Sequence, residues 1–434
     1  MFWKFSLLLA ITVSATKPLA AVSVLSHEAM VDVAWESDIV PLLLSRFPDT
    51  SPAQLKRAHS FAYGGSVIQD VGYYPLGNKF FTDLLHYVRT GDFIAFLIRD
   101  AHDVNEYAFA LGALSHYAAD TLGHAAVNLS EPILYPKLAR KYGNWITYED
   151  DHVAHLRTEF SFDVLEVAKH RYNTQQYHDF IGFDVSEDLL ERAFRDTYGM
   201  PMDKLLHYDD LTLETFRFAV GKVVPEMTEV ALATNQPKVT HERPDQAKKD
   251  FIYHLSRVDY EKQFGNKYRR PGFFARILGF LIKLLPFGPA KILGYRNPTP
   301  QAEDNYFRSM DRAMDEYRRL LHEVKNGKPM IPNRNFDTGN PTRLGEYALC
   351  DKTYAKLMKS LAKNQFNGVS PSEKADMLAF FGAGRPSNGS LSARDWKKIE
   401  AELRSLKTSS PTDSGGLEQD ENLRTQLAAV ASGN

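Results

Sequence analysis

The sequence predicts an all-α protein, because apolar residues recur at intervals of three or four along most of the chain. No sustained alternation of polar and apolar residues marks a strand. The length of 434 residues allows more than one domain, and 44% hydrophobic with 24% charged residues is an ordinary globular composition. The formal net charge of −2 gives no reason to expect a nucleic acid or an anionic surface as a partner.

Residues 1–21 have the pattern of a secretory signal peptide. An apolar run begins after Lys4, and small residues follow it up to Ala21. The run is too short to cross a bilayer, so we expect cleavage near Ala21 and export to a periplasm or out of the cell. Cys350 is the only cysteine, which leaves histidine and carboxylate side chains as the metal ligands available in any number.

The first predicted helix of the mature chain begins at Ser26 and runs through Trp35. It carries His27, which taken alone is more typical of a solvated residue near a chain end than of a metal ligand. Residues 62–75, AYGGSVIQDVGYYP, predict a loop because glycines and a closing proline punctuate them, and Asp70 lies there between apolar neighbours. A turn aspartate that bonds its own backbone and a metal ligand are equally good interpretations of Asp70.

The next predicted helix has a single apolar face. This face is formed by Phe80, Phe81, Leu84, Leu85 and Val88. His86 lies on the opposite side, together with Lys79, Thr82 and Asp83. The local pattern therefore predicts that His86 is solvated.

The central predicted helix runs from a capping-box-like start at Asp103 to about Asn128. His116, Asp120 and His124 stand four residues apart in it. Four residues advance a helix by about 400°, so the three side chains share one stripe.

The length of this stripe predicts more than one ion. From His116 to His124 the helix rises about 12 Å, which is awkward for one ion whose ligands lie at about 2.0 to 2.2 Å. Two or more ions are easier to satisfy, with Asp120 as a bridging carboxylate. The alternative is two core histidines satisfied by one aspartate. Three ligands in register on an otherwise apolar helix favour metal, because an unpaired buried charge is costly.

A loop to Asn144 leads to a second predicted ligand-bearing helix, which contains HVAHLRTEFSF. His155 and Glu159 are four residues apart in it and share a face, so one helix can supply both donors to one ion. The alternative is a surface pair on an exposed helix. His152 lies on the same face and is interpreted as a neighbour of the ligands or as a solvated residue.

Further helical patterns follow along the chain, and those at 303–324 and 344–380 look structural. The full set lies at 187–197, 202–234, 303–324, 344–380 (two short helices) and 392–406. The apolar and basic stretch 269–296 could lie in a lipid interface, act as a lid or pack against the domain. The predicted organisation is a signal peptide at 1–21, a catalytic domain at 22–240, a helical C-terminal extension at 241–407 and a disordered tail at 408–434.

Taken together, these positions resemble the zinc-dependent phospholipase C family over roughly residues 22–230. The family includes glycosylphosphatidylinositol-specific phospholipase D and, more distantly, fungal single-strand zinc nucleases. The most specific part is SHYAADTLGH, which is similar to the family's His-x3-Asp motif with a third histidine following. That histidine, His124, stands four residues after Asp120 as in the phospholipase D relatives, whereas many bacterial phospholipases C have it six residues after. The resemblance implies an all-α, multi-helix bundle with a helical C-terminal extension.

The resemblance also implies a set of ligands for about three zinc ions. The implied ligands are His27, Asp70, His86, His116, Asp120, His124, His155 and Glu159. They divide into Asp70, His86, His116 and Asp120 for one ion, His124, His155 and Glu159 for a second, and Asp120, His27 and the first mature residue for another. In known members that first residue is often tryptophan, and no tryptophan follows the expected cleavage site here.

The function implied by the resemblance is that of an exported zinc-dependent phosphodiesterase. It would hydrolyse phospholipids, in the manner of a phospholipase C or D, through a metal-bound hydroxide. Asp70 is the catalytic candidate, since it could orient or deprotonate the attacking water. Peripheral membrane contact through residues 269–296 is one of the interpretations of that stretch, beside packing against the domain.

Two alternatives keep the same metal ligands. One is a zinc nuclease acting on single-stranded nucleic acid, which would need aromatic stacking platforms and a basic groove. The other is an exported zinc-binding protein without turnover. The sequence leaves open the head group, the bond that is cut and the oligomeric state.

Overall fold

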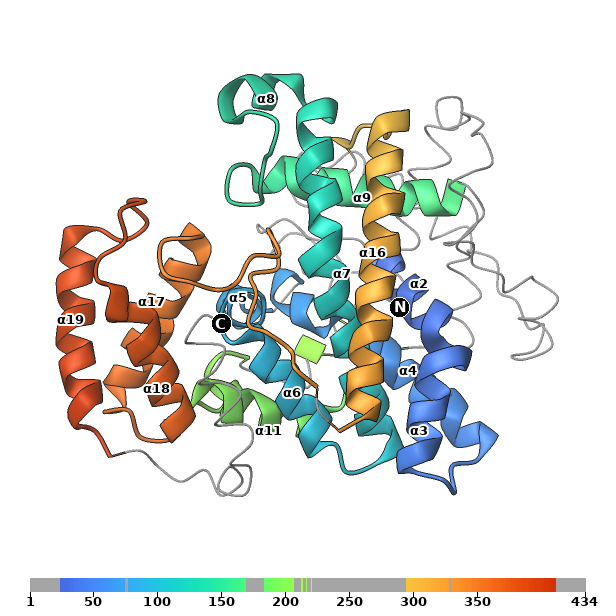
Figure 1. The fold of residues 1–434 in the computed structure, drawn as a ribbon, viewed down its shortest axis with the longest axis horizontal. Helices are drawn as coiled ribbons and strands as arrows, with labels where there is room; N and C mark the ends of the chain where they lie inside the picture. Colours follow the sequence, from blue (N-terminus) through green and yellow to red (C-terminus); the bar gives the residue numbers. More distant parts are fainter. Residues whose placement is uncertain are drawn as a thin grey trace, which may run out of the picture.

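The computed structural model describes residues 24–74, 77–168, 183–206, 212, 213, 216, 220, 294–327 and 329–410 (Figure 1). Within these residues the regular elements are all helical, and the one β pairing is an isolated bridge between Arg334 and Pro341. The predicted all-α fold is confirmed. In the described part of the chain, no helix is both long enough and apolar enough to cross a membrane.

The N-terminal part supplies all the candidate ligands. Its elements are α2 (Val24–Ala34), a π turn (Trp35–Ile39), α3 (Val40–Arg46), α4 (Pro52–Val67), a 3₁₀ turn (Ile68–Tyr73), α5 (Lys79–Tyr87), α6 (Thr90–Asp100), α7 (Val104–Leu134), α8 (Pro136–Tyr142), α9 (His152–Ala168), α11 (Glu187–Tyr198) and a 3₁₀ turn (Met202–Lys204). The helix predicted at 187–197 is confirmed as α11. Most of the helix predicted at 202–234 lies outside the described residues.

The central helix α7 begins as predicted, with the Asp103 side chain accepting hydrogen bonds from the backbone N–H groups of Asn105 and Glu106. The helix does not end near Asn128, as predicted, but continues through Pro132 to Leu134. Pro132 has no N–H to give to the Asn128 carbonyl four residues back. That carbonyl accepts instead from the N–H of Ile146, at 3.2 Å, so the helix passes the proline without losing a backbone partner.

The loop predicted at 62–75 is wrong. Residues up to Val67 belong to α4, and the 3₁₀ turn follows directly with Asp70 in it. One of the glycines that suggested a loop, Gly65, lies at a close contact between two helices. A Cβ on Gly65 would lie 2.0 Å from the carbonyl oxygen of Phe109, and a Cβ on Gly112 would lie 2.0 Å from that of Ala62. Glycine therefore lets α4 approach the backbone of α7 closely.

The C-terminal part is also helical. It consists of α16 (Pro300–Lys325), α17 (Ala348–Lys363), α18 (Pro371–Phe380), a 3₁₀ turn (Phe381–Ala383) and α19 (Ala393–Thr408). The helices predicted at 303–324, 344–380 and 392–406 are confirmed. A long connection without regular structure joins α16 to α17, apart from the short bridge within it.

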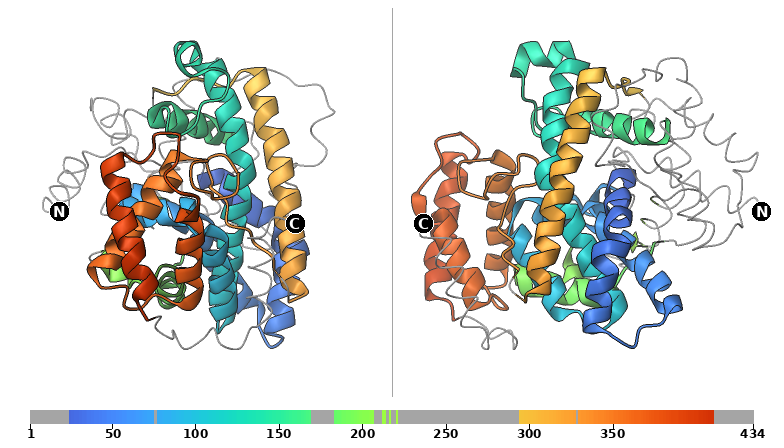
Figure 2. Two further views of the ribbon diagram at one scale, coloured as in Figure 1. Left: turned by 60° about the vertical axis from the view of Figure 1, so that its left-hand side comes forward. Right: turned by 45° about the vertical axis from the view of Figure 1, so that its right-hand side comes forward.

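Helix α16 runs antiparallel to α7 along its length (Figures 1 and 2). Near one end, the Arg296 guanidinium donates to the carbonyl of Leu134, and further along the hydroxyl of Tyr317 donates to that of Leu111. Helices α17, α18 and α19 gather on the other side of the molecule, where α17 packs against α5 (Figure 1). One apolar core contains residues of both the N-terminal and the C-terminal parts.

Several predictions concern residues that the structure does not describe. The signal peptide at 1–21, nearly all of the basic apolar stretch 269–296 and most of the tail at 408–434 lie outside the described residues. The division of the chain near residue 240 stays a prediction.

Candidate metal centre

The structure brings the eight predicted ligands together from five elements. They come from α2 (His27), the 3₁₀ turn (Asp70), α5 (His86), α7 (His116, Asp120 and His124) and α9 (His155 and Glu159). Seven of the eight are buried, and the side chain of His124 is 12% exposed. Three groups of potential donor atoms result, in each of which the atoms lie within 4.8 Å of one another.

The first group is formed by Asp70, His86 and His116. The Nε2 atom of His86 lies 3.2 Å from Oδ1 of Asp70. Asp120 lies beside this group, with its Oδ2 at 3.1 Å from Nε2 of His116 and 3.5 Å from Nε2 of His86. Two carboxylates and two imidazoles therefore converge on one space.

The prediction that His86 is solvated is wrong, because its side chain is only 3% exposed. Residues from outside α5 cover the His86 ring. The ring of Phe336, from the connection after α16, packs against His86 at 5.0 Å between centroids, and Tyr73 approaches its edge at 6.0 Å. Helical periodicity shows which residues share a face, but it does not show what covers that face.

The second group is formed by His27, His116 and Asp120. The imidazole of His27 stacks on that of His116 at 4.3 Å, and its Nε2 lies 3.4 Å from Oδ1 of Asp120. Burial, together with the neighbouring His116, lowers the pKa of His27 to about 4. This imidazole is therefore neutral at physiological pH, which is the form that binds metal.

The third group is formed by His124, His155 and Glu159. Oε1 of Glu159 lies 3.0 Å from Nε2 of His124 and 3.2 Å from Nε2 of His155. The two rings meet edge to face at 5.1 Å. The predicted sharing of one face by His155 and Glu159 therefore holds, and that face is buried against α7.

Asp120 connects all three groups. Its Oδ1 faces His27 at 3.4 Å and His124 at 3.6 Å, while its Oδ2 faces His116 and His86. Burial alone would raise the pKa of this carboxyl, but the surrounding histidines, His116 first and then His124, hold it well below its usual range. Asp120 is a carboxylate with four imidazoles around it, which suits the bridging role predicted for it.

Backbone carbonyls fix which nitrogen of His86 and His116 faces the centre. Nδ1 of His86 donates to the carbonyl of Thr82 at 3.0 Å, and Nδ1 of His116 donates to that of Ser66 at 2.8 Å. A carbonyl oxygen can only accept, so Nδ1 carries the proton and Nε2 presents a lone pair to the centre. The Nε2 atoms of these two rings face carboxylate oxygens.

The donor set fits zinc. Nε2 of His116 and Nε2 of His155 are buried and make no hydrogen bond, although each has a carboxylate oxygen within 3.2 Å. Two acceptors that close repel each other unless a cation lies between them. Zinc in proteins is usually bound by histidine nitrogens and carboxylate oxygens, and the histidine's other ring nitrogen usually donates an outer hydrogen bond that orients the ring.

Sequence reasoning missed three residues around the centre. Glu131 accepts a hydrogen bond from Nδ1 of His155 at 2.7 Å, and its position seven residues after His124 on the same stripe could have revealed it. The carbonyl of Phe336 accepts from Nδ1 of His124 at 3.0 Å, and a carboxylate oxygen of Asp337 lies 3.8 Å from the same nitrogen. No local signal marks these last two residues.

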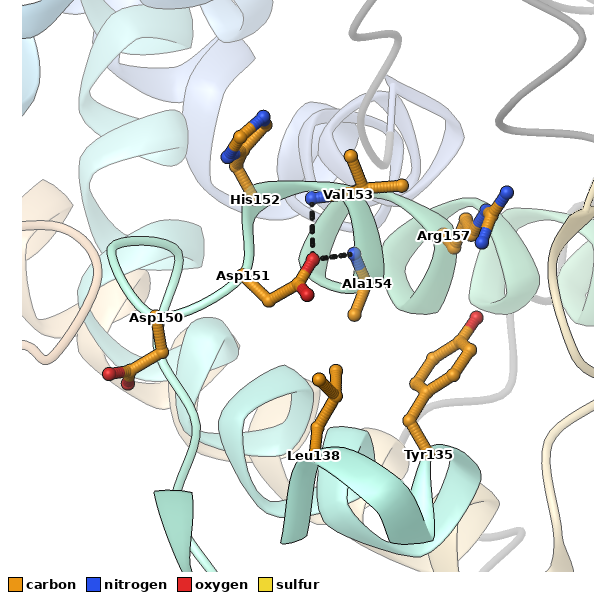
Figure 3. A pocket seen from close by; sticks show the side chains of 8 residues that line it. All are labelled: Tyr135, Leu138, Asp150, Asp151, His152, Val153, Ala154 and Arg157. Atoms are coloured by element: carbon orange, nitrogen blue, oxygen red, sulfur yellow. Dashed lines mark hydrogen bonds between the residues drawn. The ribbon is translucent and has the colours of Figure 1, made fainter. Parts of the chain in front are cut away.

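A separate pocket of about 460 Å³ opens beside the centre, between α8 and the start of α9 (Figure 3). Its lining consists of Tyr135, Leu138, Asp150, Asp151, His152, Val153, Ala154 and Arg157. None of the eight predicted ligands is among them. Asp151 there accepts hydrogen bonds from the N–H groups of Val153 and Ala154 and so caps α9. His152 is exposed, as one of its two interpretations predicted.

One comparison with known protein families gives a match. Residues 26–208 match the model of a family described as zinc dependent phospholipase C, and this range contains all eight predicted ligands. This part of the chain is similar to the zinc-dependent phospholipase C family, and that family implies a zinc-dependent phosphodiester hydrolase. No curated protein and no solved structure matches the chain. The roles of the eight residues as ligands stay predictions.

Proposed function

We propose that this protein is an exported phospholipase that hydrolyses the head-group phosphodiester of phospholipids, at the C-type or the D-type bond. One observation carries the proposal. The carboxylate of Asp120 faces histidines of three adjoining donor groups, so ions bound in these groups would lie close enough to act on one phosphate.

We assign the donors to about three zinc ions, as the family pattern implies. Asp70, His86, His116 and Asp120 would hold one, and His124, His155 and Glu159 another. Asp120, His27 and the first residue of the mature chain would hold the third. The grouping of donor atoms supports the first two assignments directly, whereas the third depends on residues 22 and 23, which are not described.

Zinc bound at these positions would lower the pKa of a water molecule and offset negative charge on the phosphoryl oxygens. Asp70 is proposed to orient the attacking water or to accept its proton. Asp70 is buried, and its Oδ1 lies 3.2 Å from Nε2 of His86 in the first group. The outer hydrogen bonds on Nδ1 keep the histidine rings from turning during the reaction.

Phospholipid is the preferred substrate because the family acts on it and because the surface near the site suits a lipid interface. The side chains of Trp145 and Leu129 are 41% and 39% exposed. These two residues are neighbours in space, because Ile146, next to Trp145, donates its N–H to the carbonyl of Asn128, next to Leu129. Three residues after Trp145, the ring of Tyr148 contacts His155 edge to face at 5.6 Å. The apolar surface residues are therefore close in the chain to the candidate centre.

Peripheral membrane contact through residues 269–296 and export after cleavage near Ala21 complete the proposal. Both rest on sequence patterns alone. Mass spectrometry of the secreted or periplasmic protein would test export, because it gives the processed N-terminus. A mature chain that keeps residues 1–21 would contradict it.

The activity is tested with phosphatidylcholine vesicles, a soluble aryl phosphodiester and single-stranded DNA, each with and without a zinc chelator. We expect zinc-dependent release of diacylglycerol and phosphocholine, or of phosphatidic acid and choline, and the product identifies the bond that is cut. Nucleotides released from DNA with no lipid product would favour a nuclease. Full zinc occupancy without hydrolysis of any of the three would favour a non-catalytic zinc-binding protein.

A further inference from the structure

A segment outside the family-matching region lies against the candidate centre. We call residues 331–342 the strap, because they connect α16 to α17 by passing over α5 and α7. The hydroxyl of Tyr117 donates to the carbonyl of Pro332 at 2.7 Å, and that of Thr90 donates to the carbonyl of Arg334 at 2.8 Å. The strap also folds back on itself, with the N–H of Asn335 bonded to the carbonyl of Asn340.

Phe336 joins the strap to two candidate ligands through its backbone and to two through its ring. Its N–H donates to the carbonyl of His86 at 3.1 Å, and its carbonyl accepts from Nδ1 of His124 at 3.0 Å. Its ring packs against His86 at 5.0 Å and against His116 at 5.8 Å. This hydrogen bond holds His124 in the way that the carbonyls of Thr82 and Ser66 hold His86 and His116. Its acceptor, Phe336, is more than 200 positions from His124 in the sequence.

Asp337 anchors the strap at this point. Its Oδ2 accepts hydrogen bonds from the hydroxyls of Tyr87, at the end of α5, and of Tyr347, at 3.0 and 2.5 Å. Its backbone carbonyl accepts from the side-chain amide of Asn128 on α7 at 2.6 Å. Its Oδ1 lies 3.8 Å from Nδ1 of His124, where a negative charge favours the proton on Nδ1 and so the lone pair on Nε2.

We propose that the strap is part of the metal centre, with Phe336 and Asp337 as positioning residues that fix the ring and the tautomer of His124. The inference rests on the proposed role of His124 as a zinc ligand. It means that the family-matching residues 26–208 do not complete the site by themselves, since one outer hydrogen bond comes from the C-terminal part. Outer residues of this kind typically change metal affinity by about 10- to 100-fold when they are altered.

The first test compares Asp337→Asn with Asp351→Asn in the full-length chain. Asp351 is a matched control because it is a buried aspartate of the same C-terminal part, and it accepts hydrogen bonds from the N–H of Gly345 and the hydroxyl of Ser390, away from the histidines. Zinc affinity is measured by competition with a chromogenic chelator, and the visible spectrum of the cobalt-substituted protein reports the ligand geometry.

We expect Asp337→Asn to weaken the binding of one ion by about 10- to 100-fold and to alter the cobalt spectrum, with Asp351→Asn unchanged in both. Equal zinc affinities for Asp337→Asn and the unaltered chain would overturn the inference, and so would an equal loss in Asp351→Asn. Neither measurement uses a lipid. A chain that binds zinc tightly but cleaves no phospholipid would contradict the proposed function while leaving this inference standing.

The second test moves the strap without changing a charge. Gly339 has φ +73°, and a Cβ there would lie 2.1 Å from the carbonyl oxygen of Thr121 on α7. Gly389 has φ +75° with nothing within 4 Å, so its alanine variant carries the same backbone strain without the clash. We expect Gly339→Ala, but not Gly389→Ala, to weaken zinc binding. The same affinity in both variants would overturn the inference even if Asp337→Asn fails to fold.

Discussion

Asp120 and His116 lie one turn apart on α7, with Oδ2 of the aspartate 3.1 Å from Nε2 of the histidine, and the other oxygen of the same carboxylate faces His27 and His124. A single side chain thus stands between the three groups of donor atoms. This relationship explains why a stripe of three candidate ligands on one helix can organise a centre whose other members come from four further elements.

The first prediction follows from this position. Asp120→Ala should reduce phosphodiester hydrolysis by more than about 100-fold, because the loss of a bridging ligand should exceed the 10- to 100-fold effect typical of outer residues. It should also lower the number of zinc ions bound per chain, measured by elemental analysis. Asp351→Ala is the control, since it removes a buried carboxylate away from the centre. Full activity with full zinc content in Asp120→Ala would refute the shared cluster.

The second prediction concerns the exposed tryptophan near the site. Trp145→Ser should slow hydrolysis of vesicles by about fivefold or more, since burying such a side chain in lipid contributes at least about 1 kcal/mol. Hydrolysis of a soluble aryl phosphodiester should be unchanged. Met330→Ser is the control, because Met330 is an exposed apolar residue (53%) far from Trp145. It follows the C-terminal end of α16, which lies beside the start of α7, whereas Trp145 follows the other end of α7. A parallel loss on both substrates would argue against a lipid contact.

The third prediction concerns the contact between α4 and α7. Gly65→Ala should lower the free energy of unfolding by at least about 2 kcal/mol, because the added Cβ meets the backbone of α7 at 2.0 Å and neither helix can yield easily. Gly123→Ala is the matched control in a helix, since a Cβ there meets nothing within 4 Å and should stabilise by up to about 1 kcal/mol. Chemical denaturation of the zinc-free proteins measures both. Similar stabilities would contradict the packing described here.

The fourth prediction concerns pH. Glu373 on α18 is buried, and this burial raises its pKa to about 8, because Arg89 at 3.9 Å is already bonded to Asp92 and offsets only part of the cost. A carboxyl whose folded pKa exceeds its unfolded value near 4.5 binds its proton more tightly in the folded state. Its contribution to stability is therefore present below pH 4.5 and is lost as the pH rises to about 8.

Glu373→Gln should remove this loss, so that its melting temperature relative to the unaltered protein rises between about pH 5 and pH 8. Glutamine keeps an oxygen that can accept from the N–H of Ser370, as Glu373 does. Glu400→Gln, an exposed change on α19, serves as the control. If the two variants show the same dependence of melting temperature on pH, Glu373 is charged in the folded protein and its burial is compensated in another way.

Many of the candidate ligands could be found in the sequence because their pattern is local. His116, Asp120 and His124 repeat at the helical period, and so do His155 and Glu159. Isolated ligands were harder to assign. For His27, Asp70 and His86 the local patterns were neutral or pointed to solvent, and it was the resemblance to a family that grouped them with the others.

The errors arose where a local signal had a distant cause. Gly64 and Gly65 suggested a turn, yet they serve close contacts with the backbones of Asp184 and Phe109. The central helix was predicted to end near Asn128, yet it continues through Pro132, because Ile146 supplies the donor that the proline removes from the Asn128 carbonyl. In both cases the partner stands outside any window that a periodicity argument can use.

The sequence by itself determined the helical class and the faces on which the candidate ligands lie, because both follow from the spacing of side chains along one helix. Only the tertiary structure decided which faces are buried and which nitrogen of each histidine points inward. Those properties depend on acceptors such as the carbonyls of Ser66 and Phe336, and folding alone brings these backbone groups to the rings.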